Sequence, residues 1–183
     1  MRILLLAVLT LVLPARAAAD DAVWELLRGG AQVVLMRHTI TTPGVGDPAG
    51  FRLDDCATQR NLTDAGREDA RRVGAAFRQR AIPVGRVLSS PWCRCLETSR
   101  LAFGKAETWT PLSNLFDNRA NEAEQMRALR EIASRRPTGG NLVLVTHGSV
   151  VQPLTGIQPA PGELVVLTPD GAGRFRIAGR LAP

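Results

Sequence analysis

The chain contains two histidines, and each follows a short run of apolar residues. His38 follows Arg37 at the end of a run over residues 33–36, and His147 closely follows a run over residues 142–145. Continuous runs of Val and Leu are typical of strands that are covered on both faces, as in parallel sheets. Ligands of open α/β sheets bind outside the carboxyl ends of the strands. The spacing therefore predicts that the two imidazoles lie together at one sheet edge.

A third apolar segment, Val87-Leu88, precedes Arg94 and adds a second arginine near the same edge. A neutral imidazole is a good nucleophile towards phosphorus, and histidine is among the residues that form covalent intermediates. Arginine side chains and a second imidazole stabilise the charge that spreads over a transferring phosphoryl group. Backbone N–H groups at a helix start after Gly148 would add donors. The pattern predicts phosphoryl-transfer chemistry where two imidazoles and two guanidinium groups converge, from His38, His147, Arg37 and Arg94.

Helical periodicity separates these predicted strands. One stripe recurs every three or four positions, at Leu62, Gly66, Ala70, Val73 and Phe77. A second stripe at Met126, Leu129 and Ile132 is followed by Pro137, and a third helix is expected to start near Pro91. With a fourth apolar run over residues 164–167, the alternation of strands and helices predicts an α/β layer fold. The long irregular stretch over residues 39–60 is of a length that is usually functional.

The composition is that of a globular protein. The 183 residues are 45% hydrophobic and 22% charged, which excludes disordered and collagen-like classes, and the length fits one domain. Of the 23 basic residues 22 are arginine, which suits phosphate contacts, although a compositional bias of the source genome accounts for most of this excess. With no tyrosine and 4% aromatic residues, the chain is a poor fit to nucleic acid.

The N-terminal residues have the three-part pattern of a secretory signal peptide. Arg2 supplies a positive charge, residues 3–13 are an apolar run, and the small residues within 15–19 offer cleavage sites. The apolar run is too short for a membrane-spanning helix, which needs about 20 residues. We therefore expect a signal peptide over residues 1–19 and one domain over residues 20–183. The mature protein is then periplasmic or secreted, without a stable membrane anchor.

Export would place the three cysteines in an oxidising compartment. A disulfide from Cys56 to either Cys93 or Cys95 is expected, which leaves one thiol over. A zinc site is the weaker interpretation because the three cysteines match no standard ligand spacing. We expect no metal and no cofactor.

Four sequence blocks occur in one order along the chain: Leu35-Met36-Arg37-His38-Thr39, Asn61-Leu62-Thr63-Asp64-Ala65-Gly66, Ser89-Ser90-Pro91-Trp92-Cys93-Arg94-Cys95-Leu96-Glu97-Thr98 and Val145-Thr146-His147-Gly148. Together they resemble the histidine phosphatase superfamily (phosphoglycerate mutase-like). The resemblance implies a single-domain, mostly parallel central sheet flanked by helices, phosphorylation of His38 during turnover, and a pocket formed by Arg37, Arg94 and His147. Residues 48–56 and 162–167 look like an exported bacterial subgroup similar to the lipopolysaccharide core heptose-phosphate phosphatase.

Two positions depart from the family pattern. Thr39 stands where the family usually has Gly after the nucleophile, and its hydroxyl is a candidate donor to a phosphate oxygen. Gly148 stands where some branches carry the carboxylate that protonates the leaving oxygen, and it is a candidate substrate-binding residue at the helix start. In other branches the acid is a Glu on a helical insert, for which the candidates here are Glu122, slightly favoured, and then Glu124 and Asp117.

The sequence thus predicts an exported, metal-independent phosphomonoesterase that acts through a phosphohistidine on His38. Arg60 precedes the second block and is a candidate substrate-binding residue beside Thr39 and Gly148. The expected partner is a small phosphorylated substrate, such as a sugar or envelope-lipid phosphate, and a phosphoprotein is a further option. The alternative from another class is a non-catalytic exported phosphate-binding protein with a degenerate site. A two-histidine phosphoesterase is excluded because His38-Thr39-Ile40 lacks the H-x-[ST] motif.

Overall fold

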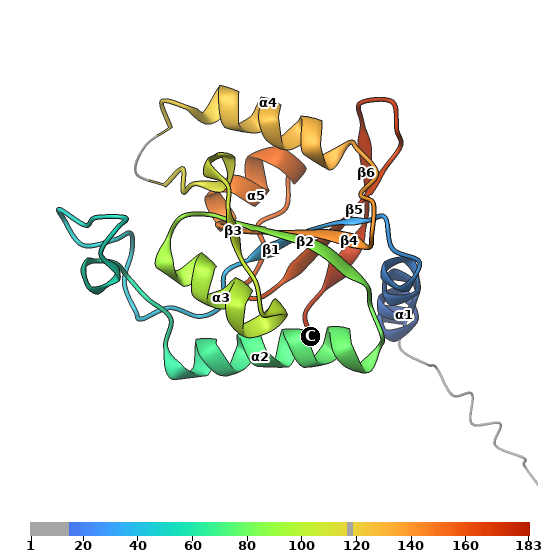
Figure 1. The fold of residues 1–183 in the computed structure, drawn as a ribbon, viewed down its shortest axis with the longest axis horizontal. Coiled ribbons are helices and arrows are strands. Elements are labelled where there is room, and N and C mark those ends of the chain that lie inside the picture. The colour runs from blue at the N-terminus through green and yellow to red at the C-terminus, as the bar shows by residue number, and fades with distance from the viewer. Residues whose placement is uncertain (1–14, 117–118) are drawn as a thin grey trace, which may run out of the picture.

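One central sheet organises the computed structural model, which describes residues 15–116 and 119–183 (Figure 1). Within those residues it has six strands in the order β3-β2-β4-β1-β5-β6. Their bounds are β1 Val33–Arg37, β2 Val84–Ser89, β3 Glu107–Thr108, β4 Asn141–Thr146, β5 Leu164–Pro169 and β6 Phe175–Leu181. Strands β1, β2, β3 and β4 run parallel, and β5 is antiparallel to both β1 and β6. The expected mostly parallel α/β sheet is confirmed.

Helices cover both faces of this sheet (Figure 1). The bounds are α1 Ala15–Arg28, α2 Asp64–Gln79, α3 Cys93–Phe103, α4 Glu122–Ala133 and α5 Gly148–Thr155, with short 3-10 helices at Cys56–Thr58 and Thr110–Leu112. Alternate residues of β1 point to opposite faces, as strand geometry requires. Val34 and Met36 pack with α1, α2 and α3, whereas Val33 and Leu35 pack with α4 and α5. Strand β1 is therefore packed between two hydrophobic clusters, and His38 is the next residue along the chain.

Helix α2 fixes the chain that leaves β1. Thr63 begins the helix by accepting a hydrogen bond from the backbone N–H of Gly66 at its hydroxyl, 3.0 Å away. The backbone of Ile40 lies directly on Gly66, so closely that a Cβ atom there would collide with the carbonyl of Ile40. Glycine at this position lets the segment after His38 rest against α2.

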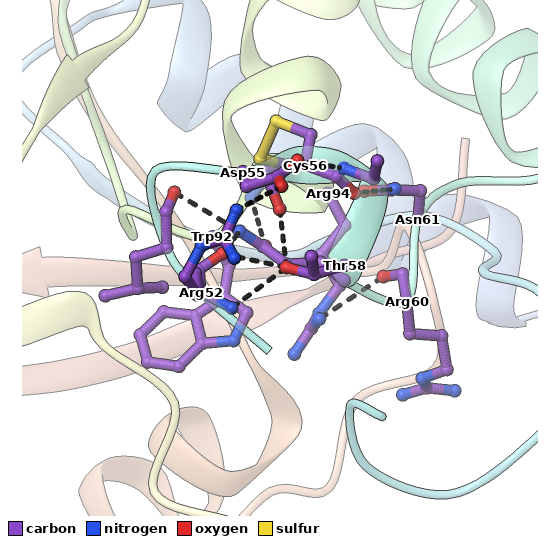
Figure 2. Close-up of a disulfide and its surroundings, with 12 residues drawn as sticks. Arg52, Asp55, Cys56, Thr58, Arg60, Asn61, Trp92 and Arg94 are labelled. Carbon is purple, nitrogen blue, oxygen red and sulfur yellow. Dashed lines mark hydrogen bonds and ion pairs between the residues drawn. A yellow bond between two sulfur atoms is a disulfide. The ribbon is translucent and has the colours of Figure 1, made fainter. Parts of the chain in front are cut away.

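The stretch over residues 39–60 is an irregular loop that a disulfide joins to α3. The bond links Cys56 to Cys93, with the two Cα atoms 5.7 Å apart, and Cys95 is a free, buried thiol. Around the bond, Asn61 donates to the carbonyl of Cys56, and Arg52 forms an ion pair with Asp55 (Figure 2). Of the two expected pairings, the structure selects Cys93.

The expected signal peptide over residues 1–19 lies largely outside the described residues. Helix α1 starts at Ala15, and its described side chains that pack in the core are Val23, Trp24 and Leu27. In the part of the chain that the structure describes, every helix is too short or too polar to cross a membrane.

Candidate active site

Three neighbouring parallel strands end at the same edge of the sheet and bring two histidines and a serine together. His38 follows β1, His147 follows β4, and Ser90 follows β2. The backbone continues the sheet pairing for one more residue, because N–H of His38 donates to the carbonyl of Thr146 over 2.9 Å and N–H of Ser90 donates to that of Val145 over 2.9 Å. The ring centroids of His38 and His147 are 5.3 Å apart. The convergence expected from the strand ends is present.

His38 is held as a neutral imidazole with one nitrogen available. Its Nδ1 lies 2.9 Å from the carbonyl oxygen of Thr39, which only accepts, so the Nδ1–H group donates this bond and Nε2 keeps its lone pair. Nε2 makes no hydrogen bond to any residue that the structure describes. Burial is the main reason that the pKa of His38 is lowered to about 3. The charges of Arg94 and Arg37 act in the same direction, and the hydrogen bond to Thr39 opposes them. This geometry suits a nucleophile.

Two side chains contact one ring nitrogen of His147 and hold the ring in place. Its Nε2 atom lies 2.8 Å from Oγ of Ser90 and 3.5 Å from Sγ of Cys95. The edge of its ring meets the ring of Trp92, with centroids 5.4 Å apart. Burial, followed by the proximity of His38 and the nearby arginines, lowers the pKa of His147 well below its usual value. His147 therefore enters the site as a neutral, oriented imidazole.

Three arginines carry buried nitrogen atoms that have no hydrogen-bond partner among the residues that the structure describes. These atoms are the Nε of Arg37, of Arg60 and of Arg94. Other atoms of the same side chains are anchored, since Nη1 of Arg37 donates to the carbonyl of Pro159 and Nη1 of Arg60 donates to that of Gly44. Buried polar groups are nearly always satisfied, and each unsatisfied one is costly. Three unsatisfied cationic donors in one place indicate a site for an anion.

The arginines and histidines line a pocket of about 280 Å³. Its lining residues are Arg37, His38, Gly44, Val45, Gly46, Arg60, Arg94, Asn114, Phe116, His147, Gly148, Ser149 and Gln158. The start of helix α5 contributes Gly148 and Ser149, and helix starts favour anions. A Cβ atom on Gly148 would lie 2.6 Å from Nε2 of Gln158, so only glycine fits without moving that side chain.

Three predicted candidates lie outside this pocket. The side chain of Thr39 is fully buried with its hydroxyl 3.3 Å from that of Thr98, so Thr39 contributes its carbonyl to His38 rather than a hydroxyl to the pocket. Glu122 lies in the first turn of α4 and pairs with Arg119. Glu124 lines a different cavity. Asp117 lies outside the described residues. In the described part of the chain, no three His, Cys, Asp or Glu side chains could together hold a metal ion.

Two residues of the site were given no individual role on the basis of the sequence. Ser90 supports His147, and Asp47 binds Arg94 from within the long loop. A serine after a strand and an aspartate between Gly46 and Pro48 are common in loops, so neither stands out in the sequence. The feature of the sequence that could have indicated a role for Asp47 is its position in a loop whose length suggests function.

Comparison with known proteins supports a family. The family model for the histidine phosphatase superfamily (branch 1) matches residues 33–116, which include His38, Arg60 and Arg94. This match supports the resemblance of the chain to the histidine phosphatase superfamily. A comparison with curated proteins finds no match, so the heptose-phosphate phosphatase subgroup has no support beyond the sequence blocks.

Solved structures of several phosphatases share the fold. The protein histidine phosphatase SixA complexed with tungstate is 19% identical, with a TM-score of 0.56 over 83% of this chain and 97% of that chain. A putative phosphohistidine phosphatase SixA from Agrobacterium tumefaciens is 24% identical, with a TM-score of 0.55 over 84% and 99%. A phosphoserine phosphatase from Entamoeba histolytica in complex with 3-phosphoglyceric acid is 12% identical, with a TM-score of 0.61 over 83% and 97%. At these identities the likeness shows the fold.

Proposed function

We propose that this chain is an exported, metal-independent phosphomonoesterase that forms a phosphohistidine on His38. The observation that carries the proposal is the anion pocket itself. Within the described part of the chain, Nε2 of a neutral His38 is unpaired and shares that pocket with three arginines whose buried Nε atoms have no partner. The superfamily match over residues 33–116 supports a phosphatase activity independently of that geometry.

In the first step Nε2 of His38 attacks phosphorus, and the bond from phosphorus to the leaving oxygen breaks. The leaving group departs with that electron pair, and the phosphoryl group stays on Nε2. The carbonyl of Thr39, 2.9 Å from Nδ1, stabilises the positive charge that the ring then carries. Arg37, Arg60 and Arg94 supply positive charge to the three phosphoryl oxygens, which is the work that metal ions do in other phosphoryl-transfer sites.

In the second step a water molecule attacks the phosphoryl group. The bond between Nε2 and phosphorus breaks, His38 returns to its neutral form, and orthophosphate leaves. His147 and the backbone N–H groups at the start of α5 stabilise the transferring oxygens in both steps. The proton for the leaving oxygen comes from an acidic side chain or from water, and Asp117 is the residue to test first.

The substrate is proposed to be a small phosphorylated compound. A pocket of about 280 Å³ accepts a phosphoryl group and part of the group attached to it. The blocks that resemble the exported subgroup favour a sugar phosphate or an envelope-lipid phosphate. Phosphohistidine and phosphoserine enter the screen because solved structures with this fold are named for those substrates.

Export is proposed on the pattern over residues 1–19. Cleavage after Ala19 would keep the described core residues of α1, which are Val23, Trp24 and Leu27. The disulfide between Cys56 and Cys93 also fits an oxidising compartment. An alkaline phosphatase fusion to the first 30 residues, compared in cells with the same fusion lacking residues 1–19, tests this: only the first is expected to be active outside the cytoplasm.

The activity is tested with purified protein from Asp20 onward and an aryl phosphate in the presence of EDTA. His38→Ala removes the nucleophile and is expected to abolish phosphate release while leaving the far-UV circular dichroism unchanged. Brief reaction with radiolabelled substrate should trap an acid-labile, alkali-stable phosphoenzyme in the wild type and none in His38→Ala.

A panel of sugar, lipid and amino-acid phosphates follows if the aryl phosphate is not hydrolysed. Turnover that needs an added metal ion would contradict the metal-independent mechanism. Measurable phosphate binding without turnover of any compound would instead establish the alternative, a phosphate-binding protein with a degenerate catalytic site.

A further inference from the structure

Asp47 is a buried carboxylate in an otherwise exposed loop. Its side chain is 0% exposed and forms an ion pair with Arg94, whose side chain is 1% exposed. The contact has two points, since Nη1 of Arg94 donates to Oδ1 over 2.6 Å and Nη2 donates to Oδ2 over 3.1 Å. Paired bonds of this kind fix the plane of a guanidinium as well as its position.

The same carboxylate holds two further parts of the pocket. The backbone N–H of Arg60 donates to Oδ1 over 3.0 Å, and Nε1 of Trp92 donates to Oδ2 over 3.0 Å. Trp92 in turn meets the ring of His147. Each oxygen of Asp47 thus accepts two hydrogen bonds, and those bonds lead to both Arg60 and Arg94 and to the indole beside His147.

This arrangement determines which edge of Arg94 remains available. Nη1 and Nη2 are engaged by Asp47, and Nη1 also contacts the carbonyl of Arg60 over 3.3 Å. The Nε atom of Arg94 is buried without a partner in residues 15–116 and 119–183, and Arg94 lines the pocket of His38. Asp47 also cancels one of the positive charges of the three arginines, which leaves a net charge of two, and that balances a phosphate dianion.

We propose that Asp47 is a positioning residue for oxyanion binding, which presents the Nε edge of Arg94 to the phosphoryl group and ties the Gly44–Asp47 segment to the pocket. The proposal rests on the proposed function, because it names the device that orients the phosphate-binding arginine of that site. Asp47 does not itself contact the phosphoryl group. Removing either partner of this buried ion pair would leave the other charge buried without compensation, which is costly in free energy. Asp47 and Arg94 therefore act as one unit.

Asp47→Asn is the decisive variant, because it keeps the volume and one acceptor oxygen but removes the charge. Asp54→Asn is its matched control, since Asp54 lies in the same loop with a side chain that is 85% exposed and 3.7 Å from its arginine partner. Calorimetric titration with tungstate and with inorganic phosphate measures the binding. We expect Asp47→Asn to weaken both by about tenfold or more, and Asp54→Asn to leave both unchanged.

A double-mutant cycle separates positioning from a general loss of stability. In an Arg94→Lys background the two-point contact is already gone, so Asp47→Asn should have little further effect on tungstate affinity. Equal losses in both backgrounds would overturn the proposal, as would wild-type affinity in Asp47→Asn. Should Asp47→Asn not fold, Asp47→Glu keeps the charge but displaces the carboxylate, and it should bind tungstate more weakly while unfolding cooperatively.

Activity measurements keep this proposal distinct from the proposed function. In an active enzyme, Asp47→Asn should raise KM for the aryl phosphate more than it lowers kcat, because ground-state binding of the phosphoryl group is affected first. A wild-type protein that binds tungstate without hydrolysing any phosphoester would refute the phosphatase but leave the Asp47 titration as a full test of positioning. A change confined to kcat would overturn the positioning role.

Discussion

The hydroxyl oxygen of Ser90 lies 2.8 Å from Nε2 of His147, at the point where β2 and β4 end side by side. Both residues are buried, and Ser90 is two positions before Trp92, whose backbone N–H reaches the same hydroxyl over 3.4 Å. A single serine therefore connects the second histidine to the start of helix α3. This contact engages Nε2 of the His147 ring.

Ser90→Ala should lower kcat/KM by roughly five- to tenfold, because one hydrogen bond to a buried ring is worth about 1 kcal/mol. Steady-state kinetics with the aryl phosphate measure the loss. Ser99→Ala is the matched control, as Ser99 is also buried but its hydroxyl donates to the carbonyl of Cys95. Equal kinetics for Ser90→Ala and wild type would show that the ring needs no such support.

Stability should fall in mild acid because the folded chain holds its histidines neutral. The imidazole of His38 has a pKa of about 3 when folded and its ordinary value of 6.5 when unfolded. Between these values the unfolded state binds more protons, so the free energy of unfolding decreases as the pH falls from about 6.5 towards 3. The lowered pKa of His147 acts in the same direction.

Urea denaturation between pH 4.5 and pH 8 measures this dependence. His38→Gln, which has no titrating ring, should show a smaller loss of stability over that range than the wild type. Identical slopes for the two proteins would mean that His38 is not held neutral by burial. The activity of the wild type should likewise show no acidic limb with a midpoint near 6.5 that belongs to His38.

Reduction of the disulfide should destabilise the chain by about 2–4 kcal/mol, since it closes a loop of 37 residues between Cys56 and Cys93. It should also weaken tungstate binding, because Cys93 is adjacent to Arg94. Denaturation and titration with and without reductant provide the measurement. The double variant Cys56→Ser and Cys93→Ser is the control, and reductant should not change its behaviour.

The third cysteine should not react with thiol reagents in the native state. Cys95 is fully buried, and burial raises the pKa of its thiol to about 12, so almost no thiolate is present at neutral pH. Thiol titration of the oxidised protein is expected to find no reactive thiol before denaturation and one after it. A fast-reacting native thiol would contradict the disulfide between Cys56 and Cys93 or the burial of Cys95.

Gly66→Ala should both destabilise the chain and reduce activity. A Cβ atom at Gly66 would collide with the carbonyl of Ile40, two residues after His38, so α2 or the segment after β1 must move. Overpacking of this kind costs about 1–3 kcal/mol or more. Gly29→Ala is the control, because the nearest atom to a Cβ there is 3.4 Å away. Chemical denaturation and kcat/KM are measured for both variants. If Gly66→Ala behaves like Gly29→Ala in both measurements, the close packing of Gly66 against Ile40 is not needed.

The positions of the two histidines follow from local sequence patterns. Continuous apolar runs before His38 and His147 predict buried parallel strands, and parallel strands end at a common edge. The α2 stripe and its Thr63 cap are also local features, because helix starts and faces depend on residues within one or two turns. Strands β3 and β6 lie at the sheet edges and lack such runs, so the sequence does not indicate them.

What the sequence by itself determined is the α/β alternation, the sheet edge that carries both histidines, and a long irregular loop whose length indicates function. The pairing of Cys56 with Cys93, the contact of Asp47 with Arg94, and the places of Thr39 and Glu122 outside the pocket depend on tertiary structure. The physical reason is that these contacts join an irregular loop to distant elements. An irregular loop has no periodic pattern that shows which of its side chains are buried. The tertiary packing therefore determines their positions.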